Sequence, residues 1–263
     1  VDLSYLERSP TYRTANGFQA KNDQRSARLY SQYVFRFDDG LFQWVIPTVQ
    51  LGNAWNFAGE LKERFVDLGF ETKVRTAQTN MHSRYYRGLE RWGGIDFEDI
   101  WLLHTCFNTQ PGLKLAFGGS INYSHVVAQS EDPPIMEKEV AASAWVDLRP
   151  IDRLYIETSY TYVKGNALET DKELYEGYIM RSRWSLQLTK ALSLRLVGQY
   201  NDFSESFDLD PLLTYRISPF SVFYVGSTYD YCTYNGLGVD GRDTKTCLTS
   251  RQFFMKLQYL FQI

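Results

Sequence analysis

Polar and apolar residues alternate along most of the chain, most clearly from Leu174 to Tyr200. In the first half of this stretch one parity carries large apolar side chains such as Met180 and Trp184, and the other carries Arg181 and Arg183. After a short break the same alternation restarts. Because successive side chains of a strand point to opposite faces of its sheet, this pattern predicts a β-hairpin with one apolar and one polar face.

The same alternation predicts strands along the rest of the chain, about fifteen in all, which is an odd number. The predicted strands include Arg28–Phe37, Leu41–Leu51, Leu61–Val74, Met81–Leu89, Ile95–Phe107, Leu113–His125, Val140–Leu148, Leu154–Tyr162, Phe207–Ile217, Val222–Tyr231 and Arg251–Ile263, with weaker candidates at Val1–Glu7 and Tyr12–Ala20. Pro47 has no backbone N–H for a ladder hydrogen bond and therefore indicates a bulge or a local edge within its strand.

Short and long connections alternate between these strands. Short turns are predicted at Asp38–Gly40, Thr109–Gly112, Arg149–Asp152, Thr189–Ala191 and Ser218–Phe220, and longer polar loops at Asn53–Glu60, Val127–Lys138, Lys164–Lys172 and Cys232–Thr249. Outer-membrane barrels have short periplasmic turns and long extracellular loops. Many of the strands also approach the roughly 9–11 residues that cross a bilayer as a tilted β-strand.

These two regularities predict an all-β fold: a transmembrane antiparallel up-and-down β-barrel of about 14–16 strands in the bacterial outer membrane, with lipid as its surroundings. The mean hydropathy of −0.37 agrees with this fold, because only alternate residues of a barrel face lipid. The net charge of −3 argues against a nucleic-acid partner, which would require a basic surface.

Residues 1–263 are predicted to form one barrel domain, the C-terminal part of a longer chain. Bacterial single-chain barrels have even strand numbers, so the odd number predicts that upstream strands are missing. Val1 is not followed by a secretory signal peptide.

The last strand carries an alternating apolar row to the end of the chain, which includes Leu257, Tyr259, Phe261 and Ile263. Such a strand resembles the signal that the outer-membrane barrel assembly machinery recognises, and it predicts that machinery as a partner during biogenesis. The terminal residue of that signal is usually Phe, and here it is Ile263.

Three segments resemble one family more specifically: Glu173–Asn201, Pro211–Gly226 and Ser250–Phe261. They are similar to the C-terminal barrel of the DUF5916 proteins, also described as carbohydrate-binding family 9-like. The resemblance covers about the last third of the chain. It implies a membrane barrel that accompanies an N-terminal β-sandwich domain, which this sequence does not contain. No sugar-binding residue can therefore be carried over.

The polar parity supplies the candidates for side chains that line a barrel lumen. They are Lys114, Glu157, Arg181, Arg183, Arg195, Gln199, Arg216 and Lys256, with Asp147 and many Ser, Thr and Gln residues. Since unpaired buried charge is costly, the lumen must be wet, or its charges must be paired or covered by a plug. A wet lumen with this slight basic excess would weakly prefer anions, and pairing with carboxylates would remove that preference.

Cys232 and Cys247 flank one predicted extracellular loop, and we expect them to form a disulfide there. Cys106 has no predicted partner. His82, His104 and His125 are expected to be isolated, and no spacing of His, Cys and carboxylate residues predicts a metal site, so we expect no metal and no cofactor.

Two further groups have structural interpretations. The acidic residues Glu131, Asp132, Asp208, Asp210, Asp240 and Asp243 lack calcium-loop spacing and are expected to be solvated loop charges. The aromatic residues Trp44, Trp55, Trp101, Tyr160, Tyr162 and Trp184 are expected to form the aromatic girdles of a membrane barrel.

The sequence pattern predicts the fold more directly than the function, because one fold can serve many functions. The first hypothesis is a non-enzymatic anchor or scaffold for a periplasmic or surface partner, within a complex that contains other subunits. The second is a passive, porin-like channel for small solutes. The third is an outer-membrane hydrolase that uses His104, although Glu98 and Asp99 are too far along the strand to contact it.

Overall fold

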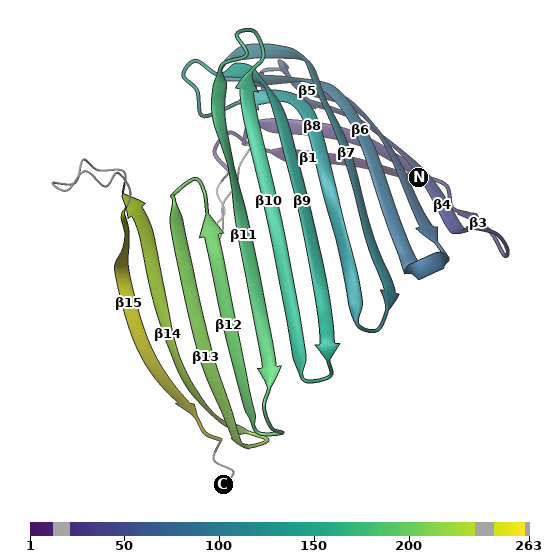
Figure 1. Cartoon of the computed structure of the whole chain (residues 1–263). Helices are drawn as coiled ribbons and strands as arrows, with labels where there is room; N and C mark the ends of the chain where they lie inside the picture. Colours follow the sequence, from purple (N-terminus) through teal and green to yellow (C-terminus); the bar gives the residue numbers. More distant parts are fainter. Residues whose placement is uncertain (13–21, 235–244, 261–263) are drawn as a thin grey trace. The chain divides into compact units, whose positions relative to one another are not determined.

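A computed structural model describes residues 1–12, 22–234 and 245–260 of the chain. The described residues form one antiparallel sheet of fifteen strands, in which strands follow one another in chain order (Figure 1). The fold class predicted from the alternation, an all-β up-and-down sheet, is therefore confirmed. Tyr12–Ala20, Asp240, Asp243, Phe261 and Ile263 lie wholly or mostly outside the described residues.

The strands of the first half are β1 (Asp2–Arg8), β2 (Gln24–Gln32), β3 (Phe35–Arg36), β4 (Phe42–Trp55), β5 (Leu61–Val74), β6 (Thr79–Trp92), β7 (Ile95–Gly112) and β8 (Leu115–Ala128). Those of the second half are β9 (Ile135–Ile151), β10 (Leu154–Ala167), β11 (Glu173–Gln187), β12 (Leu192–Asn201), β13 (Ser206–Ser218), β14 (Ser221–Tyr234) and β15 (Lys245–Gln258). A short 3-10 helix, Thr76–Gln78, precedes β6. Among the described residues, no helix combines the length and the hydrophobicity that a membrane crossing requires.

β2 and β3 are two parts of one interrupted strand. On β4, Gln32 lies opposite Thr48 and Phe35 lies opposite Val45, so both pieces keep the same register. Pro47 lies at the break, where it accepts a hydrogen bond from the Tyr33 N–H but has no N–H to return. The predicted local edge at Pro47 is therefore confirmed.

This interruption explains why the number of strands in the structure is odd. The hydrogen-bonded path runs through fourteen strands, from β1 to β15, and β3 lies off it. The odd count that predicted missing upstream strands treated Arg28–Phe37 as one strand and included Tyr12–Ala20, which lies mostly outside the described residues, so missing upstream strands stay a prediction.

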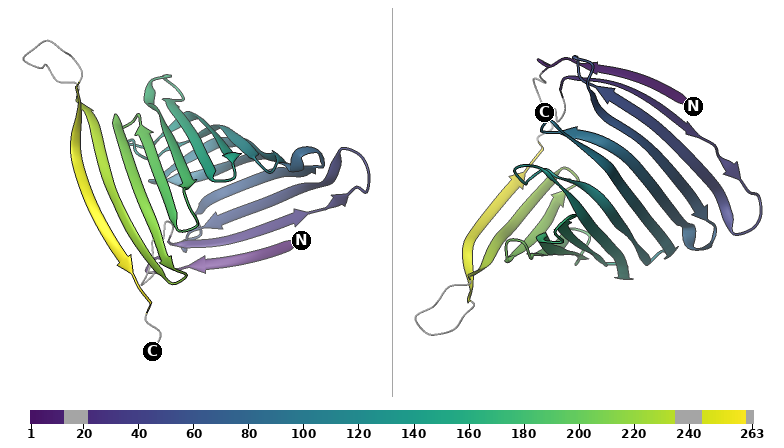
Figure 2. Two further views of the ribbon diagram at one scale, coloured as in Figure 1. Left: turned by 60° about the horizontal axis from the view of Figure 1, so that its bottom comes forward. Right: turned by 90° about the horizontal axis from the view of Figure 1, so that it is seen from above.

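The chain divides into two compact units, each of which is a set of neighbouring strand segments. Unit 1 comprises residues 1–109, 119–142 and 164–175, and unit 2 comprises residues 110–118, 143–163 and 176–263. In unit 1, β4, β5 and β6 lie side by side in both views of Figure 2, and in unit 2 the same holds for β12 to β15.

Each unit places its large apolar side chains on one face of the sheet. In unit 1, Leu68, Tyr85 and Leu103 form a direct cross-strand row with exposures of 49%, 40% and 46%. In unit 2, Leu194 pairs with Leu186 and Leu213 on the corresponding face. A small buried cluster in unit 1, centred on Phe97, Ile100 and Val127, is the only hydrophobic core cluster found among the described residues. The large apolar side chains are therefore mostly exposed on this face of the sheet.

Phe254 departs from this alternation, because it lies on the polar face of β15. It pairs directly with Gly226 on β14, and a Cβ at that glycine would come within 2.5 Å of the Phe254 ring. The ring covers a backbone position without a side chain, a known arrangement in which an aromatic residue compensates a strand glycine.

Candidate functional site

Charged side chains of unit 2 form rows across the polar face of the sheet, which we call the charged face. In one row Arg181 on β11 lies opposite Gln199 on β12, and Gln199 lies opposite Asp208 on β13. The row continues to Asp230 on β14. Because neighbouring strands lie about 4.8 Å apart, Arg181 and Asp208 stand roughly 10 Å from each other across one intervening strand.

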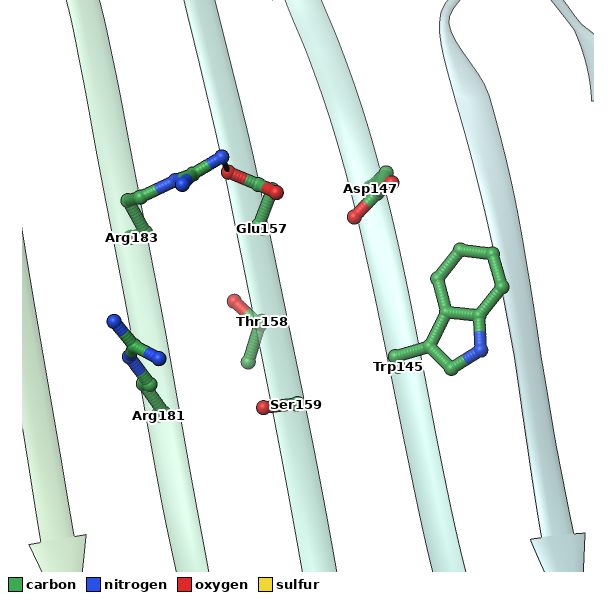
Figure 3. A pocket seen from close by; sticks show the side chains of 7 residues that line it. All are labelled: Trp145, Asp147, Glu157, Thr158, Ser159, Arg181 and Arg183. Atoms are coloured by element: carbon green, nitrogen blue, oxygen red, sulfur yellow. Dashed lines mark ion pairs between the residues drawn. The ribbon is translucent and has the colours of Figure 1, made fainter. Parts of the chain in front are cut away.

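A hollow of about 450 Å³ opens on the charged face over β9, β10 and β11. It is lined by Trp145, Asp147, Glu157, Thr158, Ser159, Arg181 and Arg183. Figure 3 shows Arg183 turned toward Glu157 on the neighbouring strand, and the two form an ion pair. Arg181 lines the same hollow and has no ion pair within the described residues. The hollow therefore combines one ion pair with a guanidinium and a carboxylate, those of Arg181 and Asp147, that are in no described ion pair.

A second hollow of about 560 Å³ lies beside the turn between β7 and β8. Asp147 accepts a hydrogen bond from the Tyr155 hydroxyl at 2.9 Å, and the Arg149 guanidinium stacks 5.0 Å from the Tyr155 ring centre. Lys114 also lines this hollow, but the prediction that it lies on a strand is wrong. The predicted turn at Thr109–Gly112 is shifted to Leu113 and Lys114, so the strand alternation does not set the direction of the Lys114 side chain.

The other predicted lumen residues lie in strands. Arg195 lies opposite Leu212, Arg216 opposite Val222, and Lys256 opposite Tyr224. Among the described residues these three cations make no ion pair.

Three carboxylates of the charged face were missed. Asp208 and Asp210 were interpreted as solvated loop charges although they fall within the predicted strand Phe207–Ile217; both lie in β13, and Asp230 on β14 is the direct partner of Asp208. The spacing of Asp208 and Asp210, two residues apart with Leu209 between them, was the signal that could have placed them on a polar strand face. With these residues included, the charged face carries both signs, and the predicted basic excess becomes smaller.

Cys232 and Cys247 are direct cross-strand partners on β14 and β15, so their predicted proximity is confirmed. Both are free thiols in the structure, however, and the predicted disulfide is not formed in it. Cross-strand proximity fixes the distance between the two residues, whereas a disulfide also requires specific side-chain torsions.

The C-terminal row is described as far as Leu260. Leu257 and Tyr259 are 61% and 56% exposed, as expected for β15, whose residues are exposed on both faces. Phe261 and Ile263, the other members of the predicted assembly signal, lie outside the described residues, so recognition by the assembly machinery stays a prediction.

Two of the predicted girdle aromatics, Tyr160 and Trp101, contact other aromatic rings on the apolar face. Tyr160, Tyr178 and Tyr200 form a row across β10, β11 and β12, with ring centres 5.4 Å and 5.6 Å apart. In unit 1, Trp101 packs against Tyr123 and His125 at 5.2 Å and 4.7 Å.

The prediction of isolated histidines is wrong for two of the three. The rings of His82 and His104 lie 5.6 Å apart, and Cys106 joins them to form a group of metal-ligand type. Sequence spacing alone could not reveal this group, because it depends on the pairing of β6 with β7.

No family model and no curated protein matches the chain. An anion-selective porin from Comamonas acidovorans has a TM-score of 0.43 and 7% identity, over 89% of this chain and 87% of the porin. A NanC porin structure has a TM-score of 0.27 and 9% identity, over 91% of this chain and 94% of that one. At these TM-scores neither similarity carries a conclusion about this chain.

Proposed function

We propose that this chain is an outer-membrane β-barrel protein whose charged face lines a passive path for small hydrophilic solutes. The observation that carries the proposal is the contrast between the two faces of the sheet. Strand after strand turns large apolar side chains outward on one face and charged or hydroxyl side chains on the other.

The apolar face favours a lipid environment. Leu68, Leu103 and Met180 are each between 46% and 49% exposed, although each lies near the middle of a long strand. Exposed apolar area costs about 25 cal/mol per Å² in water, and soluble proteins rarely expose a contiguous apolar surface of this extent. Contact with acyl chains removes this cost.

In lipid, the backbone N–H and C=O groups at the edges of a sheet also need hydrogen-bond partners. The first and last strands of the path, β1 and β15, each have one hydrogen-bonded neighbour on that path. Unsatisfied backbone groups cost several kcal/mol each in the hydrocarbon region, so only closed barrels are stable there among β-structures. Closure into a barrel is accordingly part of the proposal.

The polar face supports a water-filled path. Arg183 is paired with Glu157, Arg181 beside it forms no ion pair with any residue that the structure describes, and Asp208 and Asp230 face each other as like charges. Such groups are stable where water solvates them. Because both signs are present, we expect weak charge selectivity.

The first prediction concerns that selectivity in planar bilayers. Arg181→Gln should shift the permeability ratio toward cations, and Asp208→Asn, in the same cross-strand row, should shift it toward anions. One charge at about 8 Å in water contributes about 0.5 kcal/mol, which corresponds to about a twofold change in each ratio. The reversal potential under a salt gradient measures both shifts.

Ser159→Ala is the matched control, because Ser159 lines the hollow and carries no charge. Shifts of the same sign in the two charge variants would contradict the proposal. Absence of conductance from the folded protein would contradict it as well and would favour the anchor or scaffold, which rests on the resemblance to the DUF5916 proteins.

A further inference from the structure

Two histidines and a cysteine meet on the polar face of unit 1, outside the charged face. On paired strands β6 and β7, His82 lies opposite Cys106 and Arg84 lies opposite His104. His104 and Cys106 are two residues apart, so they share a face, and His82 completes a triangle across the strand gap. One ligand atom from each of the three lies within 4.8 Å of the others.

This spacing is close to that of a metal centre. Tetrahedral Zn²⁺ with bonds of about 2.0–2.1 Å to nitrogen and about 2.3 Å to sulfur separates its ligand atoms by roughly 3.3–3.8 Å. Side-chain rotations that move each ligand atom by about 1 Å therefore suffice to enclose an ion. All three residues are partly buried, so they combine access from solvent with protein walls.

His104 is already oriented. Its Nδ1 lies 2.5 Å from the Asn122 Oδ1 on β8. An amide oxygen only accepts hydrogen bonds, so Nδ1 carries the proton and Nε2 keeps the lone pair that binds a metal ion. Metal-binding histidines commonly donate their other ring N–H in this way.

The charged residues around this group are compatible with a bound cation. Arg84, the direct neighbour of His104, is held by Asp67 at 2.5 Å, which compensates its charge. Glu71 lies directly opposite His82 on β5, on the same face as the group. Because Asp67 is neutralised by Arg84, the net negative potential near the three ligands comes from the Glu71 carboxylate.

We propose that His82, His104 and Cys106 bind one borderline-soft divalent transition-metal ion of the Zn²⁺ type, with water as the fourth ligand. Imidazole and thiolate together select such ions over Mg²⁺ and Ca²⁺, which require oxygen ligands. On binding, the Cys106 thiol releases its proton to solvent and coordinates as thiolate. The inference does not depend on whether the barrel conducts solutes.

The test uses the detergent-solubilised chain with Cys232 and Cys247 both changed to serine, kept reduced with a phosphine. Titration with Co²⁺ should give one equivalent of a thiolate-to-cobalt charge-transfer band, and Zn²⁺ should displace it. Cys106→Ser should abolish the band, and His82→Gln or His104→Gln should weaken Co²⁺ binding at least about tenfold. Asn122→Ala should weaken it about tenfold through the loss of ring orientation.

His125→Gln is the control, because His125 packs against Trp101 and lies outside the group. Its titration should match that of the parent protein. The proposal is overturned if the parent shows no charge-transfer band, or if His125→Gln loses as much affinity as His82→Gln. The titration of the parent protein tests metal binding by itself. The proposal can therefore be overturned even if one of the variants does not fold.

Discussion

Gly88 occupies a point on β6 where a neighbouring backbone leaves no room for a side chain. A Cβ at this position would lie 2.7 Å from the Arg64 carbonyl oxygen and 3.0 Å from the Phe65 Cβ. The register of β6 with β7 shifts immediately after it, between Gly88 and Glu90. Glycine at this point therefore permits a close approach of β5 to an irregular part of β6.

We expect Gly88→Ala to lower the free energy of unfolding by about 1–3 kcal/mol, the usual cost of overpacking. Gly198→Ala is the matched strand control, because the nearest atom to its added Cβ lies at 3.8 Å, an ordinary van der Waals distance. Urea unfolding of the reconstituted protein, followed by tryptophan fluorescence, measures both. Equal losses in the two variants would show that the close approach at Gly88 is not the cause.

At the scale of elements, the alternation of side chains predicted strands well and their ends less well. Leu61–Val74 was predicted with the bounds that β5 has. The turn at Thr109–Gly112 was misplaced, because Pro111 and Gly112 are typical turn residues but here end a strand. Alternation reports which face a residue occupies, whereas a strand end depends on hydrogen bonds to its neighbours, which a single sequence does not display.

Pro47 offers a test of the interruption between β2 and β3. Tyr33 donates to the Pro47 carbonyl, and a residue with an N–H at position 47 would donate back to Tyr33, because both backbone groups of one strand residue point to the same side. Pro47→Val should add one hydrogen bond, worth about 0.5–1.5 kcal/mol, although about 0.4–1 kcal/mol is offset by the freer unfolded chain.

Local hydrogen exchange is therefore the better measurement than overall stability. We expect the new amide at position 47 to be protected and exchange at Phe35 and Phe37, whose amides point toward β4, to slow, while β14 amides exchange as before. Rapid exchange at position 47 would mean that the strand is interrupted for another reason.

At the scale of the whole molecule, strand order followed from the sequence and cross-strand contacts did not. Consecutive antiparallel strands joined by short turns leave few alternatives to an up-and-down order. The group of His82, His104 and Cys106 depends on the register of β6 with β7, and a slip of one residue would place these side chains on opposite faces. For the same reason, the pairing of Asp208 with Asp230 was not predicted.

The assignment of one face to lipid can be tested on a single strand. Leu196 and Gln199 both lie in β12, Leu196 37% exposed on the apolar face and Gln199 opposite Asp208 on the charged face. In lipid vesicles, Leu196→Arg should lower the free energy of unfolding by about 2–4 kcal/mol, the cost of an arginine facing the middle of a bilayer. Gln199→Arg should change it by less than about 0.5 kcal/mol, since water and Asp208 accommodate the new charge. A larger loss for Gln199→Arg than for Leu196→Arg would reverse the two faces, and with them the proposed path.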